Sequence, residues 1–318
     1  MKNVKKNKPK ISVIMVTYNR KKYLVRSLES ILCQSFSNFE LILINNGSSD
    51  GTGKLCREYA KKDSRIKIIN IKENKGASRG RNIGIDSAVS EYITIVDDDD
   101  YCEKGMLEHL VNLANEYNAD ISMCGSYNNF GDRLEPYFIF DNLLVLDKVQ
   151  ALDELLRREK YNVAPPTKLF RKNLFEGFRF PEGVLVDDIH VIYKVFAKAN
   201  MVVAKGKPLY HFRKHKSNMT RFIQSNSLTP ELLNEYLSMY KERTRYLLKK
   251  VPEITARARY SEWSYMISMC NKIKKYNCKN CEEQYMYMKN QLISTYKEII
   301  KSSFITKEEL VILQNIIC

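Results

Sequence analysis

The chain has 318 residues, of which 44% are apolar and 28% charged, a composition that excludes an intrinsically disordered protein. Its net charge of +15 suits an anionic partner such as nucleotide phosphates, a nucleic acid or an acidic membrane surface. Because there is no run of 18 apolar residues, we expect no membrane-spanning segment, and we expect no secretory signal. Several of the eight cysteines lie in apolar periodic segments, which favours a reduced, cytoplasmic setting. We expect the protein to be in the cytoplasm or peripheral at the inner face of the cell membrane.

Strands and helices alternate through the first hundred residues. Alternation at this pace is typical of βαβ units, in which right-handed crossovers join parallel strands. The predicted fold class is therefore α/β, with a mixed, mostly parallel sheet flanked by helices. The pattern predicts strands at 11–16, 39–44, 66–71 and 92–96, and helices at 22–33, 52–61 and 77–88.

The pattern changes after residue 100. Beyond residue 228 the chain is helical in pattern and rich in Tyr, Met and Lys. We therefore predict an α/β domain over residues 1–222 and a helical C-terminal domain over 223–318. The roles we consider for the helical domain are binding of an acceptor substrate, contact within an oligomer, and contact with a membrane surface. Between residues 100 and 222 we expect helices at 103–117, 147–158 and 187–198, and short strands at 120–124, 167–170, 201–204 and 209–212.

The most informative segment is the acidic run Asp97–Asp100, which follows the β-branched strand at 92–96. Four adjacent carboxylates repel one another and need a counter-charge. Loops at the carboxyl ends of parallel strands are where α/β proteins bind ligands. A hard divalent cation that also holds substrate phosphates would neutralise such a cluster. The alternative is a solvated acidic loop.

Polar loops also follow the first two strands. Thr17, Tyr18 and Asn19 end the first strand, where they can contact a base and a ribose. The alternative for this loop is an ordinary turn in which Asn19 caps the next helix. Asn45 opens a second polar turn at 45–50, and its amide can donate and accept hydrogen bonds. Both loops are candidates for nucleotide binding.

Two later segments carry further candidate groups. Arg81 lies in the glycine-containing segment 76–84, and its planar guanidinium suits a phosphate or a base. The alternative there is a helix start with a solvated arginine. Asp187 and Asp188 open a predicted helix, where the helix dipole favours negative charge, so a purely structural role is the alternative for them.

The basic aromatic segment 210–220 contains His211 and His215, and could fold over a diphosphate. A histidine on a strand is more often structural than a ligand. Cys278 and Cys281 form a single Cys-x-x-Cys pair, but a zinc site needs four ligands and no second pair lies nearby in the sequence. We interpret this pair as incidental.

In this order and spacing, the motifs resemble the signatures of family 2 glycosyltransferases, which are inverting enzymes with the GT-A fold. The resemblance covers about residues 10–222. The chain departs from the family pattern at Asn45, where an acidic residue is usual, at Gly80, where alanine is usual, and at Asp187, which replaces a glutamate. The segments that carry the resemblance are 16–19, 45–50, 74–84 and 97–100.

The resemblance also implies roles for individual residues. Asp188 would be the catalytic base, and Asp187 would position the acceptor. A Mn²⁺ or Mg²⁺ ion would bind Asp99 first and Asp97 next, with a further ligand from His211, or else from His215. Contacts to the nucleotide would come from Thr17, Tyr18, Asn19, Asn45, Arg81, Asp97 and Asp98.

The implied function is transfer of a sugar from a nucleotide-diphosphate donor, a UDP-sugar first, to a glycan or lipid-linked glycan in a bacterial polysaccharide or glycoconjugate pathway. A nucleotidyltransferase, which would release pyrophosphate, and a non-enzymatic RNA- or anion-binding protein are the alternatives. The basic residues are dispersed, so we expect no nucleic-acid partner. The apolar segment Val311–Ile317 is expected to cover a second subunit in a homo-oligomer or to touch lipid.

Overall fold

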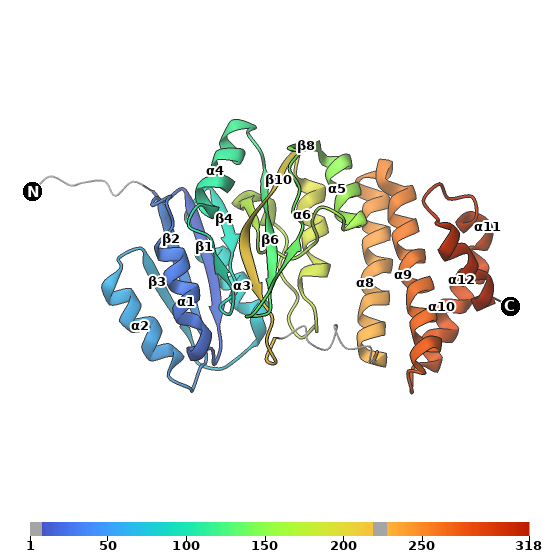
Figure 1. Cartoon of the computed structure of the whole chain (residues 1–318), viewed down its shortest axis with the longest axis horizontal. Coiled ribbons are helices and arrows are strands. Elements are labelled where there is room, and N and C mark those ends of the chain that lie inside the picture. The colour runs from blue at the N-terminus through green and yellow to red at the C-terminus, as the bar shows by residue number, and fades with distance from the viewer. Residues whose placement is uncertain (1–7, 219–227, 318) are drawn as a thin grey trace, which may run out of the picture. The chain divides into compact units, whose positions relative to one another are not determined.

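The computed structural model describes residues 8–218 and 228–317 (Figure 1). The chain forms two compact units, which we call the sheet unit and the helical unit. The domain boundary expected at residue 222 lies outside the described residues. The sheet unit comprises Met1–Ala151, Glu159–Gly183 and Asp187–His215, and the helical unit comprises Leu152–Arg158, Val184–Val186 and Lys216–Cys318.

The sheet unit is built on one mixed sheet, whose strand order is β3-β2-β1-β4-β9-β6-β10-β5. Its first half is parallel and consists of β1 (Ile11–Thr17), β2 (Phe39–Asn46), β3 (Ile66–Ile71) and β4 (Tyr92–Ile95). These strands confirm the α/β prediction. The second half consists of β9 (Lys168–Arg171), which is antiparallel to both of its neighbours, β6 (Ile121–Asn129), β10 (Met201–Arg213) and the short β5 (Tyr101–Cys102).

Helices follow the first strands as the sequence predicts, because their apolar residues recur at helical spacing. They are α1 (Lys21–Leu32), α2 (Thr52–Lys62), α3 (Gly76–Ser87) and α4 (Met106–Glu116). Alternate residues of β1 serve opposite faces of the sheet. Val13 and Met15 pack in the core cluster that includes Leu24 and Leu28 of α1 and Leu110 of α4. Burial on both faces explains why the parallel strands are almost continuously apolar.

The other face of β1 is covered by α3, which approaches closely because two of its residues are glycines. A Cβ atom on Gly80 would lie 2.5 Å from Cγ1 of Val16, and one on Gly84 would lie 2.4 Å from Cγ2 of Ile14. Real side chains do not make such contacts, so the two glycines, one helical turn apart, set the distance between helix and sheet.

Later elements differ from the prediction in two places. The helix expected at 187–198 is interrupted at Val191, and forms the 3₁₀ helix η2 (Asp188–His190) and α6 (Ile192–Lys198). The two short strands expected at 201–204 and 209–212 are one strand, β10, whose register shifts around Pro208. Proline lacks the N–H group that hydrogen bonding between strands needs. The strand pattern in the sequence is therefore interrupted at Pro208, although the strand itself continues.

The remaining elements of the sheet unit complete its edges. β7 (Leu134–Tyr137) pairs with β6, and β8 (Leu144–Asp147) pairs with β10; neither strand was predicted. α5 (Lys148–Arg157) matches the helix expected at 147–158, and the 3₁₀ helix η1 (Lys172–Phe175) follows β9. The boundary between the two units falls within α5.

Besides the second part of α5, the helical unit contains five α-helices among its described residues. They are α8 (Pro230–Lys250), α9 (Thr255–Tyr276), α10 (Glu282–Ser294), α11 (Tyr296–Ile299) and α12 (Lys307–Ile317), with the 3₁₀ helix η3 (Pro252–Ile254) after α8. Trp263, Met266 and Leu292 lie in one apolar core, which also includes Leu313 and Ile316 of α12. Part of the apolar C-terminal segment is therefore used inside its own unit, while Val311 is 57% exposed.

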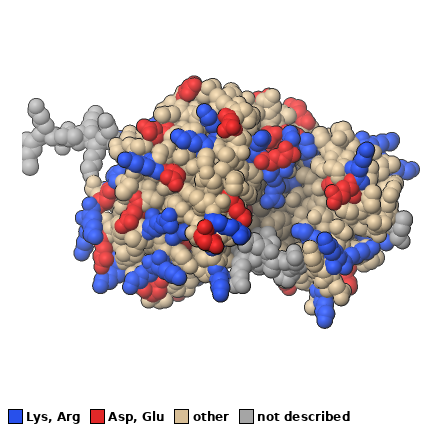
Figure 2. All heavy atoms as spheres, viewed as in Figure 1, with Lys and Arg blue, Asp and Glu red and all other residues tan. Residues whose placement is uncertain are grey.

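The distribution of charged residues on the surface and the hydropathy of the helices agree with the expectations from the sequence. Lys and Arg side chains are scattered over the face seen in Figure 2 and do not gather in one patch there. In the part of the chain that the structure describes, no helix has both the length and the apolar character needed to cross a membrane. Cys281 is buried in the helical core, Cys278 packs beside it, and both are free thiols.

The glycine contact between α3 and β1 leads to a stability prediction. Ala is normally preferred to Gly inside a helix by about 1 kcal/mol. At Gly84 we expect the opposite: Gly84→Ala should lower the free energy of unfolding by about 1–3 kcal/mol, because the new methyl group overpacks against Ile14. Chemical denaturation measures the difference.

Gly105→Ala is the matched control, because a Cβ atom there meets nothing within 4 Å. Because Gly105 is the N-cap residue of α4, where glycine is preferred to alanine, we expect this change to cost no more than about 0.5–1 kcal/mol. Equal stability of the two variants would contradict the packing argument.

Candidate active site

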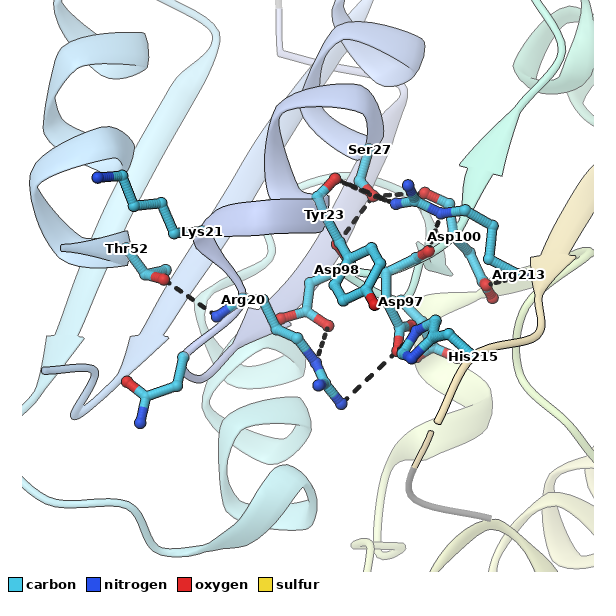
Figure 3. A network of polar contacts seen from close by, with 12 residues as sticks. Arg20, Lys21, Tyr23, Ser27, Thr52, Asp97, Asp98, Asp100, Arg213 and His215 are labelled. Carbon is cyan, nitrogen blue, oxygen red and sulfur yellow. Dashed lines mark hydrogen bonds and ion pairs between the residues drawn. The ribbon is translucent and has the colours of Figure 1, made fainter. Parts of the chain in front are cut away.

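The site lies at the carboxyl ends of β1, β2 and β4, where three loops and the end of β10 come together (Figure 3). Val96 ends the buried run of β4, and the acidic loop Asp97–Asp100 follows at once. Asp98, Asp99 and Asp100 are 8%, 9% and 4% exposed, so three of the four carboxylates are buried. The solvated acidic loop that the sequence left open as an alternative is therefore wrong.

Arginines from distant segments supply the counter-charges. Arg20, at the start of α1, places Nε 3.7 Å from Oδ1 of Asp98 and Nη2 3.6 Å from Oδ2 of Asp99. Arg81 of α3 lies 3.4 Å from Oδ1 of Asp97 through Nη2. Buried carboxylates are retained only when paired in this way.

A clamp centred on Arg213 holds the acidic loop from the other side. The Arg213 main-chain N–H donates to Oδ1 of Asp100 at 2.7 Å, and the Tyr210 hydroxyl donates to Oδ2 of the same carboxylate at 2.9 Å. The Arg213 guanidinium donates to the carbonyl oxygens of Asp99 and Tyr23 and to Oγ of Ser27. Asp100 is thus an anchor of the loop, with both of its oxygens used inside the protein.

Burial and mutual repulsion change the protonation of the acidic loop. Burial and the neighbouring charge of Asp99 raise the pKa of Asp98 to about 7. Burial likewise raises the pKa of Asp97 and of Asp100, with further contributions from adjacent carboxylates. The arginines only partly offset the charge, so the loop is suited to a further cation.

The two candidate histidines have different surroundings. His215 places Nε2 3.1 Å from Oδ2 of Asp99 and stacks on Tyr23 at 4.2 Å between ring centroids. Burial lowers its pKa, which favours the neutral imidazole that binds metals.

The structure does not bring His211 together with the acidic loop. Its Nε2 lies 2.7 Å from Oε1 of Glu103, and its ring stacks on Tyr101 at 4.2 Å. Among the residues that the structure describes, no three His, Cys, Asp or Glu side chains form a group that could hold a metal by themselves. A metal at Asp99 would therefore need ligand atoms from a substrate as well.

The loops after β1 and β2 are fastened to each other. Asn19 adopts a left-handed conformation with φ of 51°, donates its N–H to Ser48, and accepts from the N–H of Ser49 through Oδ1 at 2.9 Å. Its side chain does not cap α1, whose N-cap residue is Arg20. Thr17 is fully buried at the end of β1, whereas Tyr18 is 41% exposed and open to a ligand.

Asn45 connects the ends of two strands. Its Nδ2 donates to Oδ1 of Asn70 at 3.0 Å, and its Oδ1 accepts from the N–H of Ser48 at 3.3 Å. The next residue, Asn46, donates to Oδ1 of Asn74 at 2.9 Å and so fixes the start of α3. These are hydrogen bonds between neutral groups, which amide side chains can make. The loop therefore keeps its contacts with Asn45 in place of the usual carboxylate.

The neighbouring carboxylates Asp187 and Asp188 differ in their partners. Asp187 accepts hydrogen bonds from Nη1 of Arg81 at 2.5 Å and from Oγ of Ser78 at 2.9 Å. Arg81 therefore bridges Asp97 and Asp187, and so joins the acidic loop to the segment before η2.

Asp188, by contrast, keeps a buried Oδ1 atom that has no hydrogen-bond partner among residues 8–218 and 228–317. Burial, and next the charge of Asp187, raise the pKa of Asp188 to about 6. This group is ionised at neutral pH and is basic enough to accept a proton there.

The sequence analysis missed several residues of this network. Arg20, Tyr23 and Ser27 were not singled out, and Arg213 was noted only as part of a basic segment. A signal was present, because four adjacent carboxylates require counter-charges. Which arginines supply them depends on contacts between residues as far apart as Asp99 and Arg213.

Comparison with known proteins agrees with this geometry. Residues 12–178 match the family model described as Glycosyl transferase family 2. Glycosyltransferase GlyG of Streptococcus pneumoniae is 32% identical over 219 residues, which cover 66% of this chain and 73% of the relative. Glycosyltransferase GlyA of the same organism is 34% identical over 222 residues, or 67% of this chain, and the chain matches only 32% of GlyA's length.

Solved structures show the same fold. The S. aureus TarS fragment 1–349 in complex with UDP matches with a TM-score of 0.75 and 20% identity, over 97% of this chain and 88% of that one. The same fragment with UDP-GlcNAc matches with a TM-score of 0.73 and 22% identity, over 89% and 80% of the two chains. The sheet and its flanking helices therefore form the GT-A fold, and the chain belongs to glycosyl transferase family 2.

Proposed function

We propose that this protein transfers a sugar from a nucleotide-diphosphate donor, a UDP-sugar first, to a hydroxyl group of a glycan or glycoconjugate acceptor with inversion of the anomeric carbon. The observation that carries the proposal is the pair of adjacent carboxylates, of which Asp187 is bound to Arg81 while Asp188 has a raised pKa and an oxygen that no described residue hydrogen-bonds. The TarS complexes with UDP and UDP-GlcNAc support the choice of donor.

The donor would bind at the carboxyl ends of the parallel strands. In this proposal the exposed ring of Tyr18 and the loop of Thr17 and Asn19 contact the nucleoside, with Asn45 below them. Arg81, Asp97 and Asp98 lie toward the diphosphate. Arg81 is suited to this place because its guanidinium is already oriented by two carboxylates, Asp97 and Asp187.

The residues present fit a divalent cation, either Mn²⁺ or Mg²⁺. Asp99 offers a carboxylate oxygen and His215 a neutral imidazole nitrogen within 3.1 Å of each other, with Asp97 close by in the loop. We therefore propose His215, in preference to His211, as the further metal ligand. When bound, the cation would neutralise the negative charge that builds on the departing diphosphate.

The chemical step is a single displacement. Asp188 accepts the proton of the acceptor hydroxyl while the acceptor oxygen forms a bond to the anomeric carbon. The bond between that carbon and the diphosphate oxygen breaks on the opposite face, and the nucleoside diphosphate leaves with the electron pair. Asp187 cannot serve as base because Arg81 and Ser78 occupy its oxygens.

The assignment of the base is tested by a pair of matched variants. Asp188→Asn keeps the shape of the side chain but cannot accept a proton. We expect it to lower transfer by about 10²–10⁴-fold while UDP still binds, as measured by calorimetry.

Asp187→Asn should instead weaken UDP binding, because Arg81 loses one of the two carboxylates that orient its guanidinium. Screening UDP-sugars and measuring which product appears tests the reaction class. Release of pyrophosphate instead of UDP would contradict glycosyl transfer.

The raised pKa of Asp188 predicts the pH dependence of the reaction. Only the ionised carboxylate is a base, so activity is present above the pKa and is lost as the pH falls through it. We expect log kcat/KM to rise with a slope of about one up to pH 6 and then to level off. A rate that does not change between pH 5 and pH 7 would be inconsistent with this base.

The metal proposal is tested by chelation and by the two histidines. Excess EDTA should abolish transfer, and added Mn²⁺ should restore it. His215→Ala should raise the Mn²⁺ concentration needed for half-maximal activity by about tenfold or more, the usual loss when a group that serves a metal site is removed.

His211→Ala removes a histidine of β10 that faces Glu103, and we expect it to leave the Mn²⁺ requirement unchanged. The reverse result would return the ligand role to His211. Full activity in EDTA would remove the metal from the proposal.

A further inference from the structure

The helical unit contains a cavity of about 520 Å³ whose wall comes from α8, α9, α10 and the turn that follows α10. Cavities of this volume hold small ligands or part of a larger one. None of the residues that line it belongs to the active site described above. Nothing in the proposed sugar transfer so far uses it.

Three cations of α8 line one side of this cavity. Lys241, Arg245 and Lys249 are four residues apart, so they lie on one face of the helix at intervals of about 6 Å. All three side chains are exposed, and none forms an ion pair with another described residue. Arg259, in contrast, is paired with Glu298 at 2.5 Å.

The inner wall of the cavity contains apolar side chains and the hydroxyl group of Thr244. Trp263 is 8% exposed and lies next to Met266. Thr244 is 7% exposed, and its Oγ1 has no hydrogen-bond partner within the described ranges.

We propose that this cavity binds the phosphate-bearing part of the acceptor, a saccharide or polyol chain joined by phosphodiesters. Successive phosphates would lie on Lys241, Arg245 and Lys249, and the planar fork of Arg245 suits a phosphate in particular. The C–H faces of the sugar or polyol would pack on Trp263. This inference rests on the proposed function, because it names the class of acceptor.

The lining favours a hydroxyl-rich chain over a lipid. The side chains of Glu262 and Gln291 are polar groups of the lining, which a hydroxylated chain can use and an acyl chain would leave unpaired. The cations alone would suit the head groups of an anionic membrane equally well. Vesicles are therefore the necessary comparison.

The test uses the full-length protein and its own fluorescence. Trp263 is the only tryptophan of the chain, so its emission reports on this cavity. Poly(glycerol phosphate), neutral dextran, and vesicles of phosphatidylglycerol and phosphatidylcholine are titrated separately. We expect a saturable change with poly(glycerol phosphate), weakened by salt, and none with dextran.

Matched charge reversals identify the contacts. The variant K241E/R245E/K249E should weaken the binding of poly(glycerol phosphate) by about tenfold or more. The control K272E/K275E/K279E changes the charge equally on exposed positions outside the cavity and should bind as the parent does. Arg245→Gln, a single mild change, should give a smaller loss with an unchanged circular dichroism spectrum.

Several outcomes would overturn the inference. These are no response to poly(glycerol phosphate), a response to vesicles alone, or equal losses in the cavity and control variants. UDP binding, measured on the same samples by calorimetry, separates the two proposals. A protein that binds poly(glycerol phosphate) but not UDP would refute the proposed donor site and leave the cavity assignment standing.

Discussion

The burial of three consecutive carboxylates at the end of β4 is the constraint on which the site depends. Asp98, Asp99 and Asp100 are each at least nine-tenths buried, and Asp97 adds a fourth charge beside them. Taking such charges out of water costs several kcal/mol for each ion unless they are paired. The fold meets this cost with the guanidinium groups of Arg20 and Arg81 and with the main-chain N–H of Arg213, which all reach carboxylates of one loop.

The contacts differ along the acidic loop: one carboxylate is held by the protein, and others remain able to bind a ligand. Asp100 is held by the main chain of Arg213 and by Tyr210, so its oxygens are used within the protein. Asp97 and Asp99 face Arg81 and His215, which leaves their side of the loop suited to a diphosphate and a cation. The same division appears at Asp187 and Asp188. Asp187 holds an arginine, whereas Asp188 has an oxygen without a hydrogen-bond partner in the described part of the chain, and such differences in surroundings give neighbouring carboxylates different roles.

The sequence was a good guide to the elements and a partial guide to the site. The strands and helices of the first hundred residues were predicted within about two residues, because apolar spacing is a local property. Strands β5, β7 and β8 were missed because each is short; β5 and β8 pair with the distant β10, and β7 pairs with the neighbouring β6. In the sequence Gly80 was noted only as a glycine where alanine is usual, and its contact with Val16 explains why a glycine lies there.

By itself, the sequence determined the α/β class, the family and the loops that carry the functional groups, because strand ends and motif residues are adjacent along the chain. It also singled out Asp97–Asp100 and the pair of Asp187 and Asp188. Only the tertiary structure decided which groups face each other: that His215 rather than His211 lies against Asp99, and that Arg81 pairs with Asp187 across 106 positions. Protonation and partner choice depend on burial and on contacts between residues far apart in the chain, and neither is encoded in local spacing.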